Sequence, residues 1–134
     1  MKKMLKIMAM ILVGIVTMLL IAAQLTKNRT GMVAYTIDLI NPFVVTEEVY
    51  GIVPNEPTSS WKDAANGGQD YAYEVKTYNQ SGSKRTVRVT TFGAKIDGDV
   101  KYLKIKAKGQ SVRGYDYIAQ ENLPKKVLKA MEEK

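Results

Sequence analysis

Basic and aromatic residues alternate through positions 101–118, KYLKIKAKGQSVRGYDYI, in a pattern that could bind an anionic surface. Successive side chains of a strand point to opposite faces, so the lysines here would share one face and the apolar residues the other. Basic residues of an earlier stretch, SKRTVRVTTF at 83–92, could extend the charged face. The candidate anion contacts are Lys84, Arg88, Lys104, Lys106 and Lys108. A row of lysines also protects an edge strand from aggregation, and this simpler role is the one we favour.

The chain contains no cysteine and no histidine. A Ser-His-Asp or Cys-His catalytic site, a zinc site of Cys and His ligands, and a lipid anchor on an N-terminal cysteine are therefore excluded. Carboxylates remain, but Glu47 and Glu48 would point to opposite faces of a strand, and no pair is placed for acid–base chemistry. A serine–lysine nucleophile stays open, although nothing selects one serine. We expect a non-enzymatic protein with no catalytic residues, cofactor or metal.

Trp61 is the only tryptophan, and it lies in a polar stretch at 54–70, PNEPTSSWKDAANGGQD. The prolines, glycines and small polar residues predict a long loop, with one short helical turn around residues 61–65. A loop of this length is either functional or mobile. Trp61 could stack on a ligand such as a sugar, but we favour a role in which it pins the loop to the end of a barrel.

Residues 1–26 predict either a signal peptide or a transmembrane anchor. Three lysines precede an uncharged segment at 7–26. About 20 apolar residues cross a bilayer, whereas the apolar part of a signal peptide usually has about 7–15. Cleavage after Ala23 is conceivable, but Ile21 occupies a position that prefers a small residue, so we favour a retained anchor. In both cases the flanking charges place residues 27–134 outside the cell membrane.

The pattern of residues 27–134 predicts a small, mainly β domain. Strands are predicted at 32–39, 43–53, 71–78, 83–92, 101–108 and 111–118. The strongest hairpin joins 71–78 to 83–92 through the turn NQSG. A final helix would carry Leu123, Val127, Leu128 and Met131 on one face and dock on the sheet. These elements favour a closed or partly closed barrel, although periodicity alone does not distinguish it from a small sandwich.

Three segments resemble one known family: YAYEVKTYNQSGSKR, YLKIKAKGQSVRGYDYI and LPKKVLKAM. Together with the N-terminal apolar segment, they make the chain similar to the YxeA-like family of small exported proteins of Gram-positive bacteria. The resemblance covers nearly the whole chain and implies an OB-like β-barrel. It implies no activity and no catalytic residues. Asp116, Tyr117 and the long 54–70 loop depart from the family pattern.

We therefore expect an exported envelope protein, either tethered to the cell membrane through residues 7–26 or secreted after cleavage. Its domain would bind a protein partner or an anionic envelope component, such as a polymer or lipid headgroups. Three of the seven net positive charges belong to the N-terminal lysines, so the domain is only mildly basic. Nucleic acid is the least favoured partner, since an exported domain rarely meets it. The alternatives are a carboxylate- or Ser/Lys-based enzyme and a nucleic-acid-binding OB-type barrel.

Overall fold

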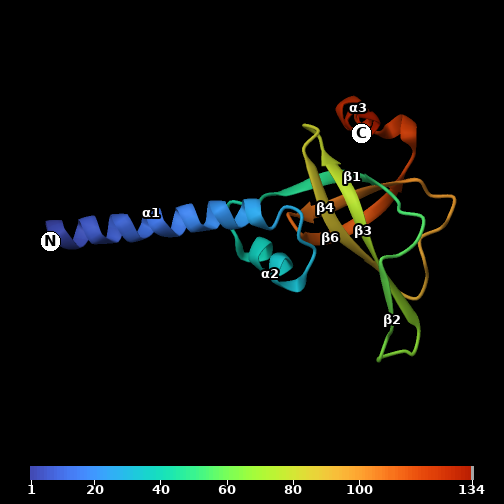
Figure 1. The fold of residues 1–134 in the computed structure, drawn as a ribbon, viewed down its shortest axis with the longest axis horizontal. Helices are drawn as coiled ribbons and strands as arrows, with labels where there is room; N and C mark the ends of the chain where they lie inside the picture. The colour runs from blue at the N-terminus through green and yellow to red at the C-terminus, as the bar shows by residue number, and fades with distance from the viewer. Residues whose placement is uncertain (134) are drawn as a thin grey trace.

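An antiparallel sheet of six strands forms the body of the domain in the computed structural model, which describes residues 1–133 (Figure 1). The strands are β1 (Thr46–Ile52), β2 (Ser59–Lys62), β3 (Gln69–Asn79), β4 (Lys84–Thr91), β5 (Tyr102–Lys108) and β6 (Ser111–Ile118). The helices are α1 (Lys2–Leu25), α2 (Met32–Ile40) and α3 (Lys125–Glu132), with a 3-10 turn, η1 (Gln120–Asn122), before α3. A mainly β fold with an N-terminal and a C-terminal helix is thus confirmed.

Strand β3 organises the sheet because it pairs with three others. It pairs with β4 along one edge and with β2 and then β1 along the other. β1 pairs in turn with β5, and β5 with β6. The sheet curls until β4 and β6, at its two ends, approach each other, and the side chain of Gln110 bonds the carbonyl of Thr86 between them. The result is a half-barrel.

The inner face of the half-barrel is an apolar core built by strict alternation. Its fully buried side chains include Val75, Val87, Val89, Leu103 and Ile105. Each such side chain stabilises the fold by about 1.5–3 kcal/mol relative to an exposed one. The predicted apolar face of residues 101–108 is confirmed in β5, because period-two alternation assigns the faces of a half-buried strand reliably.

Helix α3 covers the outer face of the sheet at one end. Leu123, Val127 and Met131 pack on three tyrosines that alternate out of the core. These are Tyr50, Tyr78 and Tyr102. The predicted docking of the final helix on the sheet is confirmed, and it explains why tyrosines of three adjacent strands are buried on the otherwise polar face.

Residues 32–40 form helix α2, so the strand predicted at 32–39 is wrong. The alternation of apolar residues there is incidental, because the side chains that become buried are Ala34, Asp38 and Asn41. Their spacing of four and three residues is that of one helical face. That face turns toward the end of α1, a contact that local periodicity does not report.

Trp61 lies in strand β2, so the helical turn predicted at 61–65 is wrong as well. β1 pairs only with residues 77–79 of β3, and β2 pairs with residues 69–72 at the other end, placing Trp61 opposite Asp70. The amide of Asp63 closes the turn by donating to the carbonyl of Gly68 at 2.7 Å. The polar 54–70 stretch is therefore largely a hairpin arm with β3 (Figure 1).

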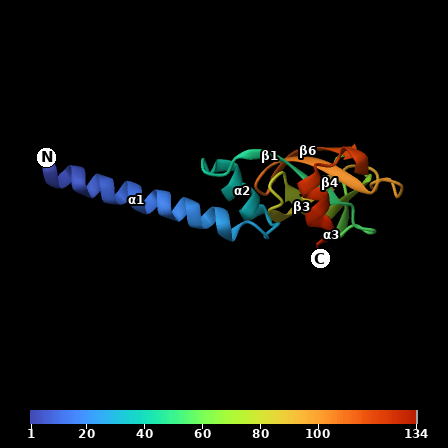
Figure 2. The same ribbon diagram turned by 90° about the horizontal axis from the view of Figure 1, so that it is seen from above.

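Helix α1 extends away from the sheet as a separate rod in both views (Figures 1 and 2). It has a mean hydropathy of 2.6 over its most apolar window, and no residue in that window is buried. Its length and composition are sufficient to cross a membrane, and an export signal near the N-terminus would show the same two properties.

Gly51 marks the tightest approach of β1 to β3, which gives a first prediction. A Cβ at this position would collide with Cγ1 of the buried Val75 and lie 3.0 Å from the carbonyl oxygen of Lys76. Overpacking of this kind costs about 1–3 kcal/mol. We expect Gly51→Ala to lower the melting temperature of the full chain in detergent micelles by several degrees.

Gly98→Ala is the matched control, because Gly98 lies in an exposed turn and a Cβ added there would have no atom within 4 Å. Equal melting temperatures for Gly51→Ala and the native chain would contradict the close β1–β3 packing.

Candidate binding groove on the open side of the half-barrel

A groove of about 700 Å³ runs along the opening between β4 and β6. Neither strand has a second strand partner among the described residues, so the groove lies between two free edges. Side chains from α2, β2, β4 and β6 line it together with residues of the adjoining loops. Those with ring or guanidinium groups are Tyr35, Trp61, Arg88, Phe92, Arg113 and Tyr115.

The charge of the groove is one-sided. Its lining includes Arg88 and Arg113 and no aspartate or glutamate. Neither arginine has an ion-pair partner within the part of the chain that the structure describes. Guanidinium groups remain charged at any physiological pH and present planar sets of N–H donors. The lining therefore favours a ligand that carries phosphate or carboxylate groups.

Arg88 and Trp61 are held against each other. The guanidinium carbon lies 5.7 Å from the indole ring centre, and Nη2 donates to the hydroxyl of Ser59 at 3.3 Å. A partly exposed cation–π contact contributes about 0.5–1 kcal/mol. Its main effect here is orientation, because it fixes one charged and one flat aromatic group side by side while most guanidinium donors stay free.

Tyr115 completes the opposite wall from β6. Its ring centre lies 6.4 Å from that of Tyr117. Partial burial raises the pKa of the Tyr115 hydroxyl, and the neighbouring Tyr117 and Tyr73 add to the shift. The hydroxyl therefore stays protonated and can donate a hydrogen bond to an anion.

The basic residues predicted as one anion-binding face are divided among four places. Arg88 alone lies in the groove, beside Trp61. Lys84 sits 5.9 Å from the Tyr78 ring near helix α3, and Lys108 donates to the carbonyl of Leu39 at 2.7 Å.

Lys104 and Lys106 line a smaller hollow of about 270 Å³ whose walls also carry two carboxylates. Glu48 on β1 lies 3.9 Å from Lys104, and Asp116 faces Lys104 across the β5–β6 pair. The lysine face is thus partly neutralised by neighbouring strands. Arg113 and Tyr115 line this hollow as well as the groove, so the two sites adjoin along β6. The sequence does contain a signal for the groove, because Arg113 and Tyr115 lie two residues apart on the predicted strand 111–118 and therefore share one face.

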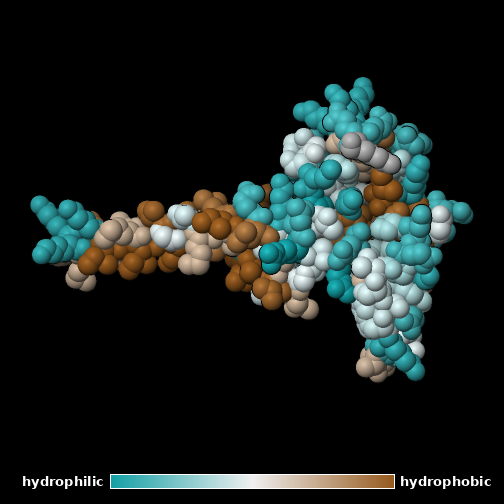
Figure 3. All heavy atoms as spheres, viewed as in Figure 1, coloured by the Kyte–Doolittle hydropathy of each residue, from teal (hydrophilic) through white to brown (hydrophobic). Residues whose placement is uncertain are grey.

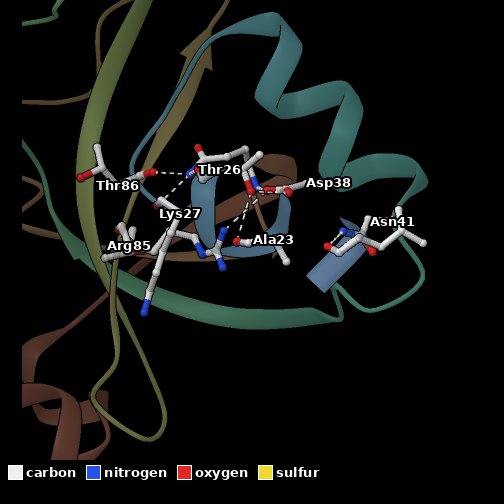
Figure 4. Close-up of polar contacts among 10 residues, drawn as sticks. Ala23, Thr26, Lys27, Asp38, Asn41, Arg85 and Thr86 are labelled. Atoms are coloured by element: carbon white, nitrogen blue, oxygen red, sulfur yellow. Dashed lines mark hydrogen bonds and ion pairs between the residues drawn. The ribbon is translucent and has the colours of Figure 1, made fainter. Parts of the chain in front are cut away.

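A network of buried polar groups adjoins the groove at Gln110, and we call Thr26, Asp38, Arg85 and Gln110 the polar clamp (Figure 4). Asp38 is fully buried. One carboxylate oxygen accepts from the Thr26 hydroxyl at 2.6 Å, and the other accepts from the amide of Gln110 at 2.7 Å and lies 3.5 Å from Arg85 Nη1. The clamp joins the end of α1 and α2 to β4 and the β5–β6 turn.

Gln110 contributes the second half of this junction. Its side-chain Nε2 lies 2.8–3.0 Å from the carbonyl oxygens of Thr26, Lys27 and Thr86. Since Gln110 also lines the groove, the polar clamp fixes the groove relative to helix α1.

The polar clamp predicts a large effect of Asp38→Ala. The substitution leaves the Gln110 amide, the Thr26 hydroxyl and the largely buried Arg85 without their shared acceptor. Removing one partner of a buried ion pair costs about 3–5 kcal/mol. We expect a large fall in the free energy of unfolding of the full chain, measured by urea titration in detergent micelles.

Asp99→Ala serves as the control, because Asp99 is exposed in a turn and its side chain makes no ion pair in the described structure. Its expected change is within about 0.5 kcal/mol. An Asp38→Ala effect as small as that of the control would show that the polar clamp contributes little.

Similarity to known proteins is concentrated in the sheet. The family model described as "Protein of unknown function (DUF1093)" matches residues 42–121. The uncharacterized protein YxeA of Bacillus subtilis is 32% identical over 90 residues, which are 67% of this chain and 71% of YxeA. A crystal structure of a DUF1093 family protein from Bacillus subtilis is 28% identical, with a TM-score of 0.50 over 67% of this chain and 94% of the other.

A more distant solved structure, from Bacillus cereus, is 19% identical with a TM-score of 0.40 over 67% of this chain and 91% of the other. The family match spans β1 to β6, and with them most of the groove lining, whereas Thr26 and Asp38 of the polar clamp lie before it. The expected YxeA-like resemblance is confirmed, and the chain belongs to the DUF1093 family of proteins of unknown function.

Proposed function

We propose that this chain is a membrane-tethered binding protein of the cell envelope, whose groove takes an anionic polymer. The observation that carries the proposal is the groove lining, which combines aromatic rings with two arginines that form no ion pair among the described residues, and which contains no acidic residue. The groove volume of about 700 Å³ is within the usual range of about 300–1,000 Å³ for ligand sites.

The position of the groove supports the same proposal through an OB-like interpretation of the fold. Taken in chain order without the short β2, the five main strands lie across the sheet as third, second, first, fourth and fifth. This arrangement fits a partly open five-stranded Greek-key barrel. Such barrels bind oligosaccharides or oligonucleotides on the second and third strands and on the loops after the first and fourth. Here those parts supply Trp61, Arg88 and Gln110, all of which line the groove.

The chemistry of the lining favours a polymer of polyol or sugar phosphates. Arginine forks match the geometry of phosphate oxygens, and an exposed indole offers a flat apolar face to a sugar ring or carbon chain. The lining contains no serine, lysine or carboxylate, which supports binding over a carboxylate- or Ser/Lys-based reaction. The tether in this proposal is α1, retained as an anchor and not cleaved as a signal.

A protein partner is the second candidate. The free edges of β4 and β6 flank the groove, and an extended segment of another protein could add to either edge by strand pairing. The two candidates differ in their dependence on charge, because backbone pairing does not require the arginines.

Trp61 provides a direct measurement, since it is the only tryptophan and lies in the groove. We expect its fluorescence in the micelle-bound full chain to change saturably on addition of poly(glycerol phosphate), with affinity that falls as salt rises. The double variant Arg88→Gln, Arg113→Gln should bind at least tenfold more weakly, because each charge-assisted hydrogen bond contributes about 1.5–3 kcal/mol.

Three comparisons sharpen this test. Lys84→Gln is the matched control outside the groove and should bind as the native chain does. Uncharged dextran should give no comparable signal. Native affinity in the double arginine variant would refute the anionic-ligand proposal, and tighter binding of a single-stranded oligonucleotide would favour the nucleic-acid alternative.

A further inference from the structure

We propose that helix α2 and the loop that follows it, residues 41–45, insert into the outer leaflet of the membrane beside α1. This inference rests on the tether in the proposed function, because it takes α1 as a membrane-spanning helix. It adds a second contact with lipid beside the spanning helix, next to the groove that Met32 and Tyr35 help to line. We call residues 32–45 the leaflet segment.

The surface of the leaflet segment is apolar and carries no exposed charge. Between Arg29 and Glu47 the sole charged residue is Asp38, which is fully buried in the polar clamp. The large apolar side chains that remain exposed are Met32, Val33, Tyr35, Ile40, Phe43 and Val45, four of them by 68% or more. The apolar surface of α1 continues onto this region in Figure 3. In water such a surface would be unfavourable, whereas lipid covers it.

The depth of the leaflet segment follows from its bonds to α1. After α1 ends, the chain reverses, and α2 leads back alongside the last turns of α1 (Figure 1). The side-chain amide of Asn41 donates to the carbonyl of Leu19 at 2.8 Å. The uncharged run begins after Lys6, and about 20 helical residues at about 1.5 Å each span the ~30 Å hydrocarbon core, so that core extends to about Leu25.

Leu19 lies six residues before that outer boundary, which corresponds to a depth of about 9 Å. Asn41 and its neighbours Ile40 and Phe43 are therefore below the outer surface of the hydrocarbon region. Helices that lie in the membrane interface bury their apolar faces by about 5–10 Å, which agrees with this depth. Lys27 and Arg29, just beyond α1, would lie at the level of anionic headgroups.

The backbone of residues 41–45 meets the condition that lipid imposes, because its early N–H groups are bonded internally. The amide of Asn41 donates to Ile37, that of Phe43 to the Asn41 side chain at 3.0 Å, and that of Val44 to the Asn41 carbonyl. Pro42 has no N–H. Lys108 also bonds the carbonyl of Leu39, one of the last in α2. Unbonded backbone groups in hydrocarbon cost several kcal/mol each, so an irregular loop there must satisfy them in this way.

The absence of natural cysteine allows single-site labelling to measure depth. Ile40→Cys and Phe43→Cys, labelled with an environment-sensitive fluorophore, are compared in full chains reconstituted into phosphatidylglycerol–phosphatidylcholine vesicles. Quenching by nitroxide-bearing lipid reports lipid contact, and quenching by aqueous iodide reports water. Leu12→Cys in α1 and Asp99→Cys in an exposed turn are the lipid and water references. Unchanged circular dichroism confirms that each labelled chain is folded.

We expect labels at positions 40 and 43 to be quenched by nitroxide lipid at least threefold more than the label at 99, and to be protected from iodide. Iodide quenching at 40 and 43 equal to that at 99, with position 12 still protected, would overturn the leaflet insertion while leaving the tether intact. Iodide access at position 12 as well would overturn both the insertion and the tether.

Discussion

The burial of one carboxylate determines how the parts of this protein are joined. A charged group removed from water is stable only if its partners replace the lost hydration. Asp38 finds them on three other segments: the hydroxyl of Thr26, the amide of Gln110 and the guanidinium of Arg85. Gly109 is adapted to the same contact, because a side chain there would collide with the Asp38 carboxylate and its φ of +56° suits glycine. Helices α1 and α2, the β5–β6 turn and the groove are therefore held together through this one carboxylate.

Local patterns were sufficient to predict most of the sheet. The hairpin predicted between 71–78 and 83–92 is the β3–β4 pair, and alternation in 101–108 identified the inward face of β5, because the two faces of a half-buried strand appear as alternating residue types. Helical spacing likewise predicted the docked face of α3. The strand predicted at 32–39 was wrong because nine residues can satisfy both the helical and the strand period. The contact that decides between the two, Asp38 with Gln110, joins residues 72 positions apart. Strand β2 was not predicted because a four-residue strand is stable only through its pairing with the end of β3.

The candidate site shows a similar division. Arg88 and Trp61 were both singled out from composition, yet nothing local placed them together, since their contact depends on β2 and β4 lying on opposite sides of β3. The lysines of β5 were predicted to form one charged face. Their partial neutralisation was missed because the acids responsible come from other strands. Glu48 reaches Lys104 only because β1, more than fifty residues earlier, pairs with β5. Charge patterns within one hairpin therefore overestimated the basic surface and missed Arg113.

The short, bonded junction between α1 and the sheet has a further consequence. Six residues, 26–31, separate α1 from α2, and three carbonyl or hydroxyl groups among Thr26 and Lys27 bond to the rest of the domain. A domain tethered by a flexible linker explores a volume whose radius grows with the length of the linker. If α1 is retained as an anchor, a domain without a flexible linker moves only in the plane of the membrane. It stays at one height above the lipid and keeps one face outward. Its search for a partner would then be two-dimensional, and distance from the lipid surface would itself become a criterion of selection.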